Sequence, residues 1–131
     1  MIDGTTPPKS VRVLVVDDLR EIRQLLRMVL ESWGYEVVEA ADGAEALEAV
    51  RSQTYALAIV DVNLPDCDGM HLAGSIRETD LTGQIKLMCI TGDRALSQQL
   101  SSGECGFDGF IMKPFGVEEL LERVSEVCGK D

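Results

Sequence analysis

The sequence has little positive charge and no long apolar run. Its 131 residues include 12 lysines and arginines against 23 aspartates and glutamates, which gives a net charge of −11. This balance repels phosphate backbones and anionic lipid headgroups, so direct nucleic-acid binding is not expected. No apolar stretch approaches the ~20 residues that span a bilayer, and residues 1–10 do not resemble a signal peptide. We therefore expect a soluble, cytoplasmic protein without membrane contact.

Soft metal ligands are also scarce. The four cysteines show no Cys-x-x-Cys spacing, and His71 is the only histidine. A zinc site is therefore not expected, and reduced thiols are the simplest interpretation. The length and the 45% hydrophobic content suit a single domain with one continuous core.

Strand-like and helix-like patterns alternate along the chain after a polar, flexible arm at residues 1–10. The predicted strands are short, apolar and rich in β-branched residues, and the predicted helices repeat apolar residues every three or four positions. Strict alternation implies right-handed crossovers and a parallel sheet covered on both faces, a three-layer α/β domain over residues 11–131. We predict strands at residues 11–16, 35–39, 56–60, 85–90 and 109–112, and helices at residues 19–33, 44–53, 70–78, 94–101 and 117–127.

Polar residues follow four of the five predicted strands. They are Asp17 and Asp18, then Asp61, Thr91 and Lys113, whereas the second strand is followed by nothing comparable. Each residue has a local explanation as a helix cap, a turn residue or a solvated lysine. Together they favour a site, because function in open α/β sheets lies beyond the carboxyl ends of the strands.

Three carboxylates in one crevice require a cation. At an effective dielectric of ~20, two unit charges ~4 Å apart repel by ~4 kcal/mol. Oxygen ligands without histidine or cysteine favour Mg²⁺ or Mn²⁺, and Mg²⁺ commonly takes a phosphate oxygen as a further ligand. The pattern predicts phosphoryl transfer, with Asp61 as nucleophile and Asp17 and Asp18 holding the metal. Lys113 would neutralise one phosphoryl oxygen and Thr91 would donate a hydrogen bond to another.

Four groups of residues surround these positions: Val15-Val16-Asp17-Asp18, Val60-Asp61 followed by Pro65 and Asp68-Gly69, Ile90-Thr91-Gly92, and Lys113-Pro114-Phe115. They resemble the motifs of the response-regulator receiver domain, and the resemblance covers about residues 11–128, nearly the whole chain. The resemblance implies a flavodoxin-like (βα)5 fold with strand order 2-1-3-4-5. It also implies that the backbone carbonyl of Asn63 completes the metal shell, that a cis peptide precedes Pro114, and that Phe110 is an aromatic switch; ordinary packing is the alternative for Phe110.

The resemblance further implies a phosphorylation cycle. A histidine kinase or phosphotransfer protein would donate the phosphoryl group to Asp61, and the chain would catalyse its own phosphorylation and dephosphorylation without being a turnover enzyme. The face made by the fourth helix, fifth strand and fifth helix would then act on a downstream protein or detached output domain. The chain would be a monomer or a weak phosphorylation-dependent dimer. Asn63 and Asp93 stand where the family tunes hydrolysis, and both predict a short-lived phosphoryl group.

Several alternatives remain open from sequence. Arg20, Arg23 and Arg27 indicate either a solvated helix face or a surface that docks the phosphodonor. An aspartate-based hydrolase is disfavoured because Asp61-Val62-Asn63 lacks a second acid. A nucleotide or flavin carrier is disfavoured because the glycine-rich phosphate motifs are missing. A pure interaction module is expected to lack one of the five site residues, and none is missing.

Overall fold

The computed structural model describes residues 11–62, 64–66, 68–92 and 107–128. The predicted arm at residues 1–10 and the predicted helix at residues 94–101 lie outside these residues. The strands are β1 (Val11–Val16), β2 (Tyr35–Ala40), β3 (Leu57–Asp61), β4 (Lys86–Thr91) and β5 (Gly109–Met112). The helices are α1 (Arg20–Ser32), α2 (Gly43–Ser52), α3 (Gly69–Thr79) and α5 (Val117–Cys128).

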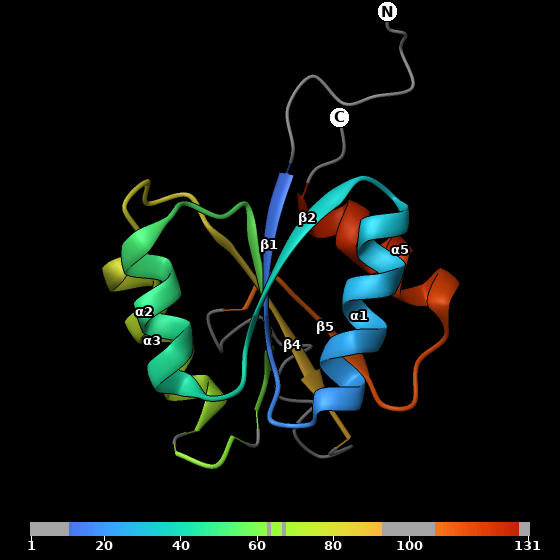
Figure 1. Cartoon of the computed structure of the whole chain (residues 1–131), viewed down its shortest axis with the longest axis horizontal. Helices are drawn as coiled ribbons and strands as arrows, with labels where there is room; N and C mark the ends of the chain where they lie inside the picture. Colours follow the sequence, from blue (N-terminus) through green and yellow to red (C-terminus); the bar gives the residue numbers. More distant parts are fainter. Residues whose placement is uncertain (1–10, 63, 67, 93–106, 129–131) are drawn as a thin grey trace, which may run out of the picture.

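The five strands form one parallel sheet in the order β2-β1-β3-β4-β5. Helices α1 and α5 cover one face of the sheet, and α2 and α3 cover the other (Figure 1). The predicted three-layer fold and strand order are confirmed. Strands β2, β3 and β4 each end one residue later than predicted, so that Asp61 and Thr91 are the last residues of β3 and β4.

Alternating side chains of the central strands build two separate cores. Val13, Val15 and Ile59 belong to the core under α1 and α5, whereas Leu14 and Val60 belong to the core under α2 and α3. This division follows from the two-residue period of a β-strand, which sends neighbouring side chains to opposite faces. All five residues of β3 are buried, so the strand that ends at Asp61 is fixed from both sides.

The start of α3 is held directly against the end of β3. The Gly69 N–H donates to the Val62 carbonyl at 2.9 Å. A Cβ atom at Gly69 would lie 2.6 Å from the Asp61 carbonyl oxygen and 2.6 Å from Val62 Cα, which is closer than real Cβ atoms approach backbone. Glycine is therefore required at this position by space, and the close approach fixes the backbone beside Asp61.

None of the described helices combines the length and the apolar character that crossing a membrane requires.

Two glycines in α3 provide a matched test of this packing. Gly69→Ala should lower the free energy of unfolding by about 2–3 kcal/mol, because backbone must move to admit the methyl group. Gly74→Ala should raise it by up to ~1 kcal/mol, because a Cβ there meets nothing within 4 Å and alanine favours the helix. Urea unfolding followed by circular dichroism measures both; equal effects of the two substitutions would contradict the close approach.

Candidate functional site

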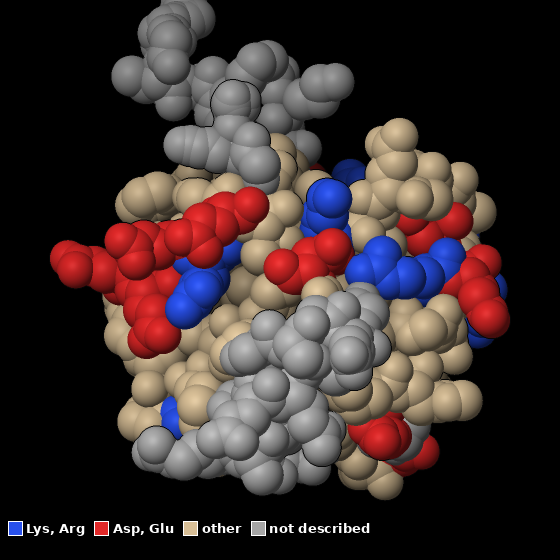
Figure 2. Space-filling view, turned by 180° about the vertical axis from the view of Figure 1, so that it is seen from behind, with Lys and Arg blue, Asp and Glu red and all other residues tan. Residues whose placement is uncertain are grey.

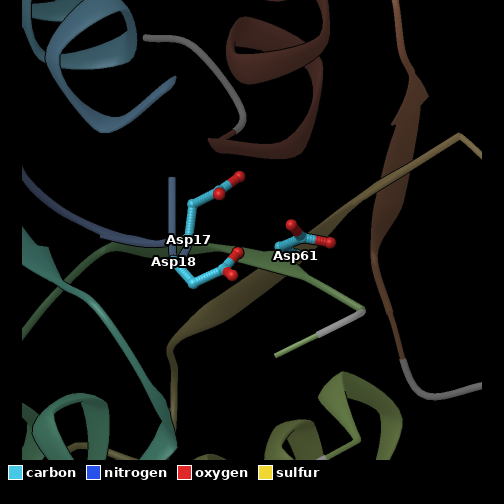
Figure 3. Close-up of side chains that lie close together, drawn as sticks. All are labelled: Asp17, Asp18 and Asp61. Carbon is cyan, nitrogen blue, oxygen red and sulfur yellow. The ribbon is translucent and has the colours of Figure 1, made fainter. Parts of the chain in front are cut away.

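Three carboxylates converge at the carboxyl ends of β1 and β3 (Figure 3). Asp17 and Asp18 follow β1, and Asp61 ends β3, which is paired with β1 in parallel register through Val16 and Val60. One oxygen atom from each carboxylate can be chosen so that all three lie within 4.8 Å of one another. Asp17 and Asp61 are buried, whereas Asp18 is exposed and borders solvent.

Lys113 brings positive charge to the same group from the end of β5. Its Nζ lies 3.3 Å from Asp61 Oδ2 and 3.7 Å from Asp17 Oδ2. Its backbone N–H donates to the Thr91 carbonyl at 2.8 Å, which ties the ends of β4 and β5 together. Thr91 is fully buried at this position. The structure thus brings four strand ends to one site, as the sequence pattern predicts.

One ammonium group does not balance three carboxylates. Burial is the largest cause that raises the pKa of Asp17, and the charges of Asp61 and Asp18 raise it further. The Leu19 N–H and Lys113 lower it without outweighing these causes. Asp17 is 0% exposed, and its Oδ2 accepts no hydrogen bond. A buried carboxylate oxygen without a hydrogen bond, beside two further carboxylates, fits a hard divalent cation such as Mg²⁺ or Mn²⁺.

Of the other predicted site features, the structure describes Phe110 and the peptide bond before Pro114. Asn63, the expected source of the metal-binding carbonyl, and Asp93, which with Asn63 is expected to tune hydrolysis, lie outside the described residues. Phe110 in β5 is partly buried and packs against the small cluster formed by Val62 and Cys89. The peptide bond between Lys113 and Pro114 is cis, as expected from the resemblance.

Known proteins resemble this chain in fold and in sequence. A model of the response regulator receiver domain matches residues 13–125. The chain belongs to the response regulator receiver domain family. Its relatives include the response regulator MprA of Mycobacterium ulcerans, which is 37% identical over 115 residues, 88% of this chain and 49% of MprA. The receiver domain therefore spans about half the length of the curated relatives it matches.

Solved structures of similar receivers superimpose over most of the chain. The chemotaxis protein CheY4 of Vibrio cholerae is 31% identical, with a TM-score of 0.83 over 91% of this chain and 99% of CheY4. The response regulator TrrA of Thermotoga maritima is 36% identical, with a TM-score of 0.77 over 89% of this chain and 98% of TrrA. The TrrA structure is a complex with Mg²⁺ and BeF.

The sequence interpretation missed a clamp behind the acidic turn. Arg23 donates from Nε to Glu39 Oε1 at 3.0 Å and from Nη1 to the Asp17 carbonyl oxygen at 2.7 Å. Arg27 donates to the second oxygen of Glu39. The Arg23 side chain is only 15% exposed, so a solvated face is the wrong interpretation for this residue. Glu39 lies in β2, the strand that was expected to add no residue to the site. Through Arg23 it links β2 to the backbone of Asp17.

A second missed contact anchors the loop after β3. Both carboxylate oxygens of Asp66 accept hydrogen bonds from the start of α2, from Gly43 N–H at 2.9 Å and Ala44 N–H at 3.1 Å. An acid at a helix N-terminus is favourable because the first N–H groups lack partners within the helix. No local signal in the sequence pairs Asp66 with a helix 23 positions earlier.

The electrostatics of Asp17 predict a stability gain on neutralisation. A pKa raised by folding means that the folded receiver holds the proton more tightly than the unfolded chain, so stability falls as pH rises from the unfolded pKa through the raised one. At neutral pH, Asp17→Asn should therefore raise the free energy of unfolding in chelator by about 1 kcal/mol or more.

Urea unfolding with and without millimolar Mg²⁺ measures this effect. Mg²⁺ should raise the free energy of unfolding of the native receiver, because an ion that binds only the folded state stabilises it. The increase should be much smaller for Asp17→Asn, which lacks one of the carboxylates that would hold the ion. Glu78→Gln, an exposed acid on α3, should behave like the native chain in both conditions. If Asp17→Asn were less stable than the native receiver and responded equally to Mg²⁺, Asp17 would neither be destabilised by its neighbours nor hold the metal.

The clamp predicts a loss of stability in acid. Burial alone would raise the pKa of Glu39, but hydrogen bonds from Arg27 and Arg23 outweigh it and lower the pKa. The stability from this carboxylate is therefore present above its unfolded pKa and is lost as pH falls through the lowered one. Glu39→Gln should cost about 1–2 kcal/mol at neutral pH, and this difference should shrink in acid.

Glu36→Gln on the same strand is the matched control for Glu39→Gln. Glu36 pairs with Arg12 at 3.3 Å, but the two side chains are 47% and 30% exposed. Its removal should cost less than ~0.5 kcal/mol, because exposed ion pairs contribute little. Unfolding in urea across a pH series compares the two; equal costs at neutral pH would show that the Glu39 clamp adds nothing beyond a surface pair.

Proposed function

We propose that this receiver domain is a switch whose Asp61 carboxylate accepts a phosphoryl group from the phosphohistidine of a histidine kinase or phosphotransfer protein. The observation that carries the proposal is the setting of Asp61. It is buried at the end of β3, with two further carboxylates on one side and the Lys113 ammonium 3.3 Å away. An acidic site with one positioned lysine suits a reaction that moves a phosphoryl group with a bound cation.

The proposed transfer forms one bond and breaks another. An Asp61 carboxylate oxygen attacks phosphorus in line as the phosphorus–nitrogen bond to histidine breaks, and the bonding pair stays on the imidazole nitrogen. The product is an acyl phosphate, which water later hydrolyses back to the carboxylate. Lys113 holds Asp61 before transfer and would pair with a phosphoryl oxygen afterwards, while the Thr91 hydroxyl would donate a hydrogen bond to another.

The cation would be Mg²⁺ or Mn²⁺, held by Asp17, Asp18 and Asp61 and by the Asn63 carbonyl. It would neutralise charge on the transferring phosphoryl group. The support for this assignment is the cluster of three carboxylates and the Asp17 oxygen without a hydrogen bond. The short phosphoryl lifetime expected from Asn63 and Asp93 also belongs to the proposal.

Switching would pass from Thr91 to the surface around β5. Phosphorylation would draw Thr91 toward the phosphoryl group and would let Phe110 move inward from its partly buried position. Phe110 is suited to this because it packs on Val62 and Cys89, which adjoin the ends of β3 and β4. The face made by the fourth helix, β5 and α5 would then bind a downstream protein or output domain in the cytoplasm, with the receiver acting as a monomer or a weak dimer.

A turnover hydrolase is the main rival. It would release phosphate from many substrate molecules, whereas a receiver forms one acyl phosphate at a time on its own carboxylate. The chain belongs to the receiver family and carries all five predicted site residues, and both facts favour the switch. Repeated hydrolysis of a phosphomonoester by the purified chain would support the rival.

Intact mass spectrometry tests the proposed acceptor. With Mg²⁺ and a small acyl-phosphate donor, the native chain should gain the mass of one phosphoryl group, and chelator should abolish the gain. Asp61→Asn should show no gain, because an amide is not a comparable nucleophile. Glu78→Gln should be phosphorylated like the native chain. Phosphorylation of Asp61→Asn at the native rate would show that the acceptor is another residue.

A further inference from the structure

A groove lies between the C-terminal end of α1 and α5. It is open to solvent, has a volume of about 440 Å³ and is lined by Trp33, Leu121, Ser125 and three glutamates of α5. Trp33, the chain's single tryptophan, directly follows α1. It is 59% exposed, which is unusually high for a tryptophan side chain. The phosphorylation site borders the start of α1, so the groove lies at the other end of this helix. Exposed aromatic side chains in such grooves are common anchors of protein interfaces.

The rim of the groove carries one sign of charge. Glu118, Glu122 and Glu126 recur every four residues and therefore form one stripe along α5. Figure 2 shows the acidic side chains gathered over this helix. Arg123 lies 3.7 Å from Glu126, but among the described residues no cation forms an ion pair with Glu118 or Glu122.

This stripe is unfavourable for the isolated fold. Like charges four residues apart destabilise a helix. Glu118 lies in the first turn, where the helix dipole favours an acid, but Glu126 lies near the other end, where the last turn has no basic residue. Among the described residues only Glu126 of this stripe has a basic partner, and a cationic ligand beside Trp33 would supply one for Glu118 and Glu122.

We propose that this groove binds a basic amphipathic helix of a protein partner. The partner would insert an apolar side chain beside Trp33 and Leu121 and would place lysine or arginine opposite Glu118 and Glu122. A second copy of the chain is disfavoured at this groove because a partner with a net charge of −11 does not complement the acidic stripe. Nucleic acid and anionic membranes are disfavoured for the same reason. This binding site goes beyond phosphoryl transfer and does not depend on it.

Trp33 makes the proposal directly measurable. The probe is a tryptophan-free synthetic peptide of roughly five helical turns, with leucine on one face and lysine on the flanking stripes. Titration should shift the Trp33 emission to shorter wavelength in a saturable way, and the affinity should fall as salt rises. The same peptide with glutamate in place of lysine should not bind.

Matched double substitutions separate the groove from general charge attraction. Glu118→Gln with Glu122→Gln should weaken binding of the lysine peptide by roughly threefold to tenfold. Glu48→Gln with Glu78→Gln removes the same charge from exposed positions on α2 and α3 and should leave the affinity unchanged. Trp33→Ala, which removes a mostly exposed side chain, should weaken binding more than about tenfold by calorimetry while the circular dichroism spectrum stays native.

Three results would overturn the proposal. Equal weakening by the two double substitutions would show attraction to the whole acidic surface. Binding unchanged by Trp33→Ala would place the peptide elsewhere. Self-association that Trp33→Ala abolishes, without saturable peptide binding, would show that a second copy occupies the groove. Since the phosphorylation site is intact in every variant, none of these results bears on the acceptor role of Asp61.

Discussion

Mutual repulsion among three carboxylates at one end of the sheet is the constraint on which the functional region depends. Asp17 and Asp61 are buried, and their oxygens lie close to each other and to those of Asp18. The Lys113 ammonium offsets only part of this charge. Burial, and then the negative charges of Asp61 and Asp18, raise the pKa of Asp17, and the uncompensated carboxylates suit the region to bind a cation. Stability is thus reduced where the proposed reaction occurs, as is common at functional sites.

The rest of the fold holds that unfavourable arrangement in place. The buried strand β3 fixes Asp61, and the contact of Gly69 with the end of β3 leaves the backbone beside Asp61 no room to relax. On the other side, Arg23, which also donates to Glu39, donates a hydrogen bond to the Asp17 carbonyl oxygen. A rigid setting of this kind allows a small change at Asp61 to be transmitted, because packed elements shift between discrete arrangements rather than deform gradually.

The sequence predicts the fold and the convergence of the acids because both arise from local patterns. Buried strands appear as continuous β-branched runs, and the residue after each strand must lie at the same sheet edge. The Arg23–Glu39 clamp could not be predicted, because it depends on how α1 crosses β2, and arginines between apolar helix positions usually indicate a solvated face. The contact of Asp66 with α2 and the groove beside Trp33 likewise depend on the packing of elements distant in sequence.

Locating the cation tests the central claim most directly. A crystal of the native chain soaked with Mn²⁺ would show the ion by its anomalous scattering. The account predicts one ion between Asp17, Asp18 and Asp61, with at least one carboxylate oxygen at about 2.0–2.3 Å. An ion bound elsewhere, with these three carboxylates left without a metal at millimolar Mn²⁺, would contradict the account.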